Sequence, residues 1–200
     1  MSFLYFFWGF LCQWGLGLVT SIFSVSGLTG HWIDRLPLLI GYVIFFVGFT
    51  RMQPLSPILG KGKWGALILI LLSIIQMLIP ANTGAANPSL LGTVLTIVII
   101  LPEMYMIYHL CTGIAKMADD QLQPDLRDTA QKRWRLFIYC QVTIVLALLT
   151  GLFADVTQPN AWTVVTGVLS LMYVVLNLIV YILMVTLVWK AHKQLELQSK

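Results

Sequence analysis

The chain has 200 residues, of which 58% are hydrophobic and only 10% are charged, and its net charge is +4. A soluble domain carries about a quarter charged residues, so an ordinary soluble fold of this chain would expose large apolar patches to water and is excluded. The positive charge does not indicate nucleic acid as a partner, because the basic residues are divided among three segments that each adjoin an apolar run. The sequence therefore predicts a single all-α domain whose partner is the lipid bilayer.

Six apolar runs predict a polytopic membrane protein with six transmembrane helices. A bilayer core of about 30 Å needs about 20 apolar residues per helix, and the six runs meet or approach this length. The first run lacks the basic start and the cleavage site of a signal peptide, so we expect a retained helix. In chain order the predicted helices cover residues 2–26, 36–52, 64–80, 89–113, 136–154 and 161–189.

The distribution of Lys and Arg predicts the orientation, because cytosolic connections are enriched in these residues. Eleven of the twelve lie in the second connection, the fourth connection and the C-terminal segment, and Arg35 alone lies on the other side. We therefore expect a multi-pass protein of the cell membrane, an N-in/C-in bundle with both termini cytosolic. The eleven residues are Arg51, Lys61, Lys63, Lys116, Arg127, Lys132, Arg133, Arg135, Lys190, Lys193 and Lys200.

The fourth connection, Ile114–Arg135, is the longest segment predicted outside the bilayer. Pro124 suits the first turn of a helix, and Asp125 and Asp128 follow near the positive end of that helix. We expect a cytosolic helix over about 124–135 that continues into the fifth membrane helix. Lys132, Arg133 and Arg135 lead into that membrane helix, and the Arg residues at its base are expected to reach lipid phosphates.

The sequence predicts no cofactor, no metal site and no catalytic residue. Cys12, Cys111 and Cys140 lie in apolar runs without a C-x-x-C pair, so we interpret them as small buried hydrophobic side chains. The motifs of phosphate-binding loops, dinucleotide sites, zinc proteases and serine hydrolases are absent from the sequence. Any functional site is therefore expected inside the membrane.

Glu103 is the charged residue predicted near the middle of a membrane helix, far along the chain from Lys63 and Lys116. An ionised carboxylate there costs at least about 2.5–3.5 kcal/mol, so we expect it to be protonated, paired with donors, or open to a water-filled cavity. Pro102 precedes it and removes a hydrogen bond to the Val98 carbonyl. Broken helices of this kind form ion sites in transporters, whereas the plainer alternative is a packing kink beside a neutral glutamic acid.

Polar side chains on other predicted helices lie at broadly similar depth and are candidate partners of Glu103. Polar groups in lipid turn inward and bond across helices, either to hold the bundle together or to form a pathway. His109 points about 120° away from Glu103 and shares a stripe with Pro102 and Tyr105, which either lines a path to the cytosol or packs. The candidate site comprises Glu103, Pro102, Tyr105, His109, Gln13, Gln76, Gln141 and Asn177.

Three functions remain open. The first expectation is a non-enzymatic membrane-embedded subunit, regulator or scaffold, because no catalytic constellation is visible and little of the chain lies outside lipid. The alternative is a small proton- or cation-coupled transporter or channel centred on Glu103, which a water-filled vestibule at Glu103 would favour. The third is an intramembrane enzyme, which needs a nucleophile or a metal beside Glu103 or His109. A membrane-protein partner or a homo-oligomer is compatible with each function.

Overall fold

The structure, a computed structural model, describes residues 3–13, 35–78, 90–153 and 161–196, and this part of the chain is all-helical. The helices α4 to α7 are long and apolar enough to cross a membrane, and α3 is a shorter apolar helix. The α-helices of the described residues are α1 (Phe3–Leu11), α3 (Leu36–Met52), α4 (Pro57–Leu78), α5 (Leu90–Asp120), α6 (Pro124–Gly151) and α7 (Ala161–Ala191), which the π-helical turn η3 (His192–Glu196) continues.

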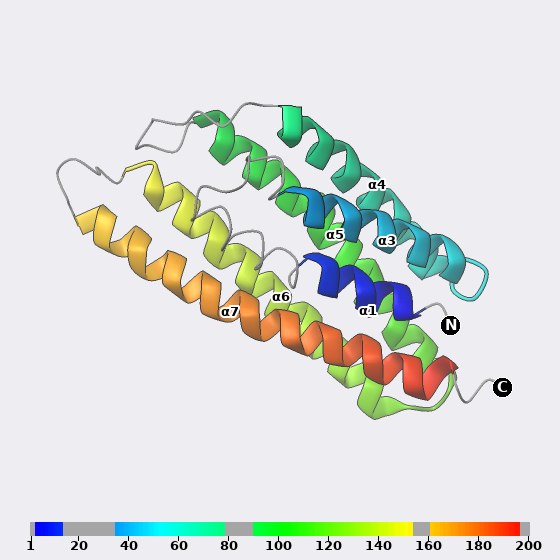
Figure 1. Cartoon of the computed structure of the whole chain (residues 1–200). Coiled ribbons are helices and arrows are strands. Elements are labelled where there is room, and N and C mark those ends of the chain that lie inside the picture. Colours follow the sequence, from blue (N-terminus) through cyan, green and yellow to red (C-terminus); the bar gives the residue numbers. More distant parts are fainter. Residues whose placement is uncertain (1–2, 14–34, 79–89, 154–160, 197–200) are drawn as a thin grey trace.

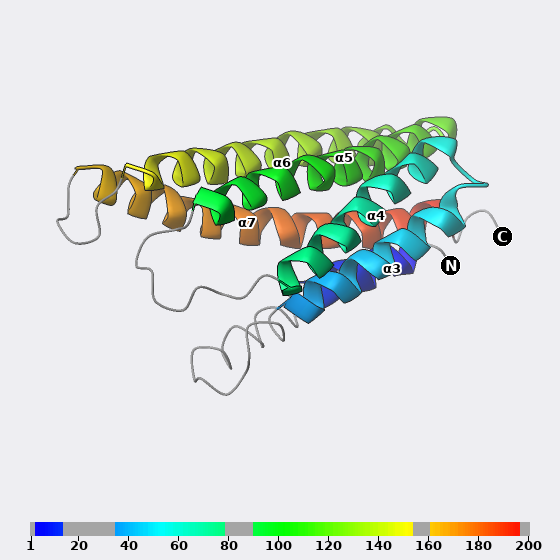
Figure 2. The same cartoon turned by 90° about the horizontal axis from the view of Figure 1, so that it is seen from above.

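The helices form a ring in which neighbours along the chain pack side by side. The helix α3 contacts α1 and α4, α5 contacts α4 and α6, and α7 contacts α6. The contact between α1 and α7 closes the ring (Figure 1). The start of α1, the turn 53–56, the turn 121–123 and η3 all lie at one end of this ring (Figure 2), which we call the basic end.

The helix bounds agree with the predicted ones in part. The helix α3 has the predicted bounds, and α6 begins at Pro124 and continues through the predicted cytosolic segment without a break. Two helices extend beyond the predicted spans: α4 begins at Pro57, whereas the predicted span begins at residue 64, and α5 runs to Asp120, whereas the predicted span ends at residue 113. Most of the first predicted helix, 2–26, lies outside the described residues.

The extension of α5 has a packing cause. Ile114 and Ala118, on its additional two turns, are completely buried, as is Ala130 on α6. These side chains belong to the same apolar cluster as the membrane-embedded residues. Burial of one helix face stabilises a helix even where the sequence is mixed in polarity. The predicted long connection therefore shrinks to the turn 121–123.

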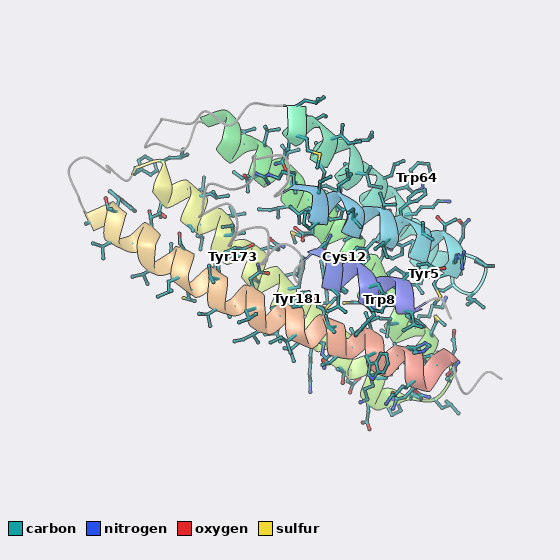
Figure 3. The ribbon with its side chains drawn as sticks, in the orientation of Figure 1. Tyr5, Trp8, Cys12, Trp64, Tyr173 and Tyr181 are labelled. Atoms are coloured by element: carbon teal, nitrogen blue, oxygen red, sulfur yellow. The ribbon has the colours of Figure 1, made fainter. Side chains whose placement is uncertain are left out.

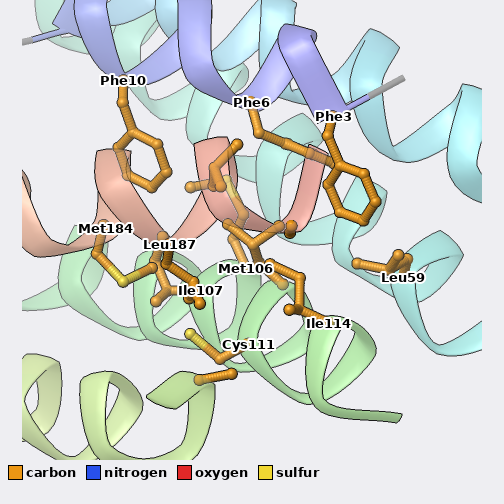
Figure 4. Packing of buried hydrophobic residues seen from close by; sticks show 14 of the residues in the cluster. Phe3, Phe6, Phe10, Leu59, Met106, Ile107, Cys111, Ile114, Met184 and Leu187 are labelled. Carbon is orange, nitrogen blue, oxygen red and sulfur yellow. The ribbon is translucent and has the colours of Figure 1, made fainter. Parts of the chain in front are cut away.

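The interior of the ring at the basic end is an apolar core built around phenylalanine. Phe6, Phe45 and Phe49 are completely buried, and the rings of Phe6 and Phe49 lie 4.7 Å apart. Figure 4 shows side chains of α1, α5 and α7 meeting in this core. Side chains in such a core interdigitate closely. These phenylalanines therefore form a closely packed part of the interior.

Candidate functional site

Glu103 lies on α5, which continues as a helix through Pro102. The side chain is partly buried, and the side-chain amide of Gln141 on α6 lies within hydrogen-bonding reach of its carboxyl group. Gln141 is only 5% exposed, so this approach takes place away from solvent. A carboxyl group inside a bundle requires such a donor, because lipid offers it no partner.

Two tyrosines from other helices complete the surroundings of Glu103. Tyr42 on α3 and Tyr173 on α7 each lie within electrostatic range of the Glu103 carboxyl. Tyr42 also lies within electrostatic range of Tyr173. The Asn177 side-chain amide donates a hydrogen bond of 3.3 Å to the Tyr173 hydroxyl. Figure 3 shows Tyr173 on α7, further from the basic end than Tyr181. Polar side chains from α3, α5, α6 and α7 thus lie within electrostatic range of one another, and we call this set the Glu103 cluster: Glu103, Gln141, Tyr42, Tyr173 and Asn177.

Two of the residues predicted as partners of Glu103 are engaged elsewhere. The Gln76 side-chain carbonyl accepts a hydrogen bond of 3.3 Å from the Arg35 guanidinium, between α4 and the start of α3. Gln13 packs against α3, where a Cβ atom added to Gly41 would lie 2.3 Å from its Cγ. The structure therefore brings Gln141 directly to Glu103, and Asn177 through Tyr173.

His109 and Tyr105 lie apart from the Glu103 cluster. Tyr105 is 42% exposed at the surface of the bundle, and its ring centroid lies 4.4 Å from that of the His109 imidazole. The ring centroid of Tyr108, which is also exposed, lies 5.2 Å from that of the imidazole. The predicted stripe therefore does not form one polar lining, because Tyr105 is exposed, His109 is buried, and the Pro102 carbonyl lies close to Gly65 on α4.

The position of the Arg133 side chain differs from the expectation that the Arg residues at the base of α6 reach lipid phosphates. Its guanidinium turns inward and donates a hydrogen bond to the backbone carbonyl of Leu183 on α7. The Thr186 hydroxyl donates to the same carbonyl at 2.9 Å. A carbonyl oxygen has two lone pairs and can accept more than one bond. Arg133 therefore links α6 to α7.

The basic end of the ring contains a cavity of about 250 Å³. A hydrogen bond of 3.5 Å from the Gln121 side chain to the Leu195 carbonyl joins two of its walls. The cavity is mainly apolar, and its lining residues are Phe3, Met52, Leu55, Met117, Asp120, Gln121 and Leu195. This cavity could not be predicted from the sequence, because its walls come from four segments far apart along the chain.

Tyr42 and Tyr173 are the members of the Glu103 cluster that the sequence analysis did not single out. The signal that points to them is a tyrosine inside an apolar run, because a buried phenol usually finds a hydrogen-bonding partner. Within the described residues, no group of three or more His, Cys, Asp and Glu side chains has an arrangement that could hold a metal ion. Comparison with protein families, with curated proteins and with solved structures finds no match to this chain.

Proposed function

We propose that this protein is a small membrane carrier or channel that binds a proton or a small cation at Glu103. The observation that carries the proposal is the contact between the Glu103 carboxyl and the buried Gln141 amide, inside a bundle of apolar helices. Intramembrane acids are rare because they are costly, and they commonly mark ion and proton pathways. Glu103 would therefore be the residue that takes up and releases the ion.

The chemistry of the Glu103 cluster suits a proton or a hard cation. A carboxylate neutralises one positive charge, and the oxygens of Gln141, Tyr42 and Tyr173 are the type of ligand that such cations prefer. A proton needs only the carboxyl group itself, with Gln141 holding that group in place. No cofactor is required for either form of binding.

The surroundings of the Glu103 cluster support access from the end of the ring opposite the basic end. The Arg35 guanidinium interacts electrostatically with Tyr42, which in turn interacts with Glu103. A positive charge, Arg35, and a hydroxyl group, Tyr42, therefore lie on that side of Glu103. Toward the basic end, by contrast, Phe45 and Leu110 are completely buried in the apolar core. Transport would require this core to open transiently.

The finer topology belongs to the same proposal: six membrane spans with both termini in the cytosol. The support is that α1 and η3 share one end of the ring with the turns 53–56 and 121–123 (Figure 1). Eleven of twelve Lys and Arg residues belong to these segments and their flanks. The positive-inside rule makes this the cytosolic end.

The proposal is tested in liposomes that contain the purified protein and a trapped pH indicator. An imposed cation or proton gradient should produce a pH response with the wild type, none with Glu103→Gln and a reduced response with Glu103→Asp. The matched control is Asp125→Asn, which makes the same carboxyl-to-amide change at an exposed position on α6. A wild-type response that Glu103→Gln leaves unchanged, with both proteins folded, would overturn the proposal.

A membrane-embedded subunit, regulator or scaffold is the second candidate function. The observation that favours it is apolar exposure at the basic end, where Leu55 beside the cavity is 63% exposed and Leu122 is 89% exposed. Exposed apolar side chains form a binding surface for a partner, because binding removes them from water. For this function, Leu55→Asp should abolish the activity of the protein in cells, and Glu103→Gln should retain it.

A further inference from the structure

His109 is a buried polar side chain on α5, next to two tyrosines that are exposed at the surface. It is 8% exposed, and the ring centroids of Tyr105 and Tyr108 lie 4.4 Å and 5.2 Å from that of its imidazole. Its Nδ1 atom is buried and has no hydrogen-bond partner among the described residues. A buried polar atom without a partner costs about 1–3 kcal/mol and calls for a ligand or a water molecule.

Lys61 on α4 brings a positive charge to the same place. Its ammonium group is close enough to His109 for an electrostatic interaction. Lys61 is exposed, and it forms no ion pair or hydrogen bond within the described part of the chain. Lys63 differs, since it donates a hydrogen bond of 2.9 Å to Gln53 and lies 5.6 Å from the Trp64 ring centroid. The Lys61 ammonium group therefore carries a charge that no described residue pairs with.

Aromatic rings extend this face across α5 to α6. The Tyr108 ring lies 5.3 Å from that of Trp134, and Tyr105 and Tyr108 are both exposed. Tyrosine and tryptophan prefer the headgroup level of a bilayer, where their apolar rings contact lipid and their polar atoms remain hydrated. Lys61 and His109 thus lie beside an aromatic surface of the kind that proteins place at the headgroup level of a bilayer.

We propose that Lys61, His109 and the rings of Tyr105, Tyr108 and Trp134 form a binding site for an anionic phospholipid. Lys61 would pair with the headgroup phosphate, His109 would supply a hydrogen bond, and the aromatic rings would contact the glycerol and acyl region. Basic pockets between membrane helices on the cytosolic side are known to select such lipids. The aromatic surface distinguishes a lipid from free phosphate, which has no apolar part to bury.

The test measures lipid retention by the purified protein. Protein exchanged into nanodiscs of mixed phosphatidylglycerol and phosphatidylcholine is released into detergent, and its bound lipids are counted by native mass spectrometry. The wild type should retain phosphatidylglycerol in preference. Lys61→Gln should reduce this preference by roughly fivefold, which corresponds to the loss of one basic residue near a membrane surface. His109→Leu should also reduce it, and Lys63→Gln is the matched control that should leave it unchanged.

The thermal midpoint of each variant in the same detergent shows whether it is folded, and Lys61→Gln, at an exposed position, is expected to match the wild type. Equal retention of the two lipids by the wild type would overturn the proposal, as would an equal effect of Lys61→Gln and Lys63→Gln. Displacement of the retained lipid by inorganic phosphate alone would also overturn it, in favour of a site for free phosphate.

Discussion

The backbone amide of Gln123 donates a hydrogen bond of 2.8 Å to the carbonyl of Ala118 and closes the turn between α5 and α6. The Leu122 amide donates to the Asp119 carbonyl at 3.0 Å within the same turn. This pair of bonds is the Schellman arrangement, which places one residue in the left-handed region. That residue is Leu122, whose φ is 56°, although glycine is usual at this position. The turn thus holds a side chain in a conformation that costs free energy.

Leu122→Gly is therefore expected to raise the free energy of unfolding by about 1 kcal/mol, because glycine adopts a positive φ without steric cost. Leu122 is 89% exposed, so little apolar burial is lost. The measurement is thermal unfolding in detergent. The control is Gln131→Gly at an exposed position within α6, which should lower stability by about 1 kcal/mol. Equal destabilisation by both variants would show that the strain at Leu122 is absent.

Gly65→Ala is expected to destabilise the protein through the contact between α4 and α5. A Cβ atom added to Gly65 would lie 2.9 Å from the Pro102 carbonyl oxygen and 3.1 Å from the Met106 Cβ. Backbone cannot move aside as a flexible side chain does, so we expect a loss of about 1–3 kcal/mol. Since Pro102 adjoins Glu103, any ion response should weaken as well.

The matched control for this glycine is Gly167→Ala on α7. A Cβ atom added there would meet nothing within 4 Å. Alanine has the higher helix propensity, so this variant should be neutral or more stable by up to about 1 kcal/mol. Thermal unfolding of the two variants side by side checks the pair. A Gly65→Ala protein as stable as Gly167→Ala would contradict the close approach of α4 and α5.

Arg133→Met is expected to lower the free energy of unfolding by about 1.5 kcal/mol. The variant removes the hydrogen bond from the guanidinium to the Leu183 carbonyl, and bonds from charged donors contribute about this much. Arg135→Met, which removes an exposed Arg from the same helix, should change stability by less than about 0.5 kcal/mol. Chemical or thermal unfolding in one detergent measures the stability of both variants. A larger loss for Arg135→Met would show that Arg133 does not link α6 to α7.

Single cysteines labelled by an impermeant thiol reagent in intact cells test the six-span topology. In a background without Cys12, Cys111 and Cys140, cysteines at Pro54, Leu122 and Gln198 should be protected, and those at Thr29, Asn82 and Gln158 should be labelled. Pro54 is chosen within the turn 53–56 because it is exposed. Ser56 in the same turn is 3% exposed, so a cysteine there would be protected on either side of the membrane. Labelling of all six positions after permeabilisation is the control. One reversed position would contradict the orientation.

The sequence by itself determined the features that depend on local chemistry. The apolar run of α3 ends where flanking charge and turn residues begin, so its bounds follow from composition alone. Pro124 likewise marks the start of α6, because its fixed φ and missing amide suit the first helical turn. Glu103 also stands out in the sequence, because a carboxyl group in an apolar run needs an explanation wherever the helix packs.

Only the tertiary structure decided which side chains meet. Gln13, Gln76 and Gln141 were equivalent candidates in the sequence, yet Gln141 is the one that lies within hydrogen-bonding reach of Glu103, while Gln76 accepts a hydrogen bond from Arg35. The length of an apolar run fixes neither the rotation of a helix about its axis nor its neighbour across the ring. Those quantities follow from how side chains of several helices fill one interior, which also turns Arg133 inward to α7.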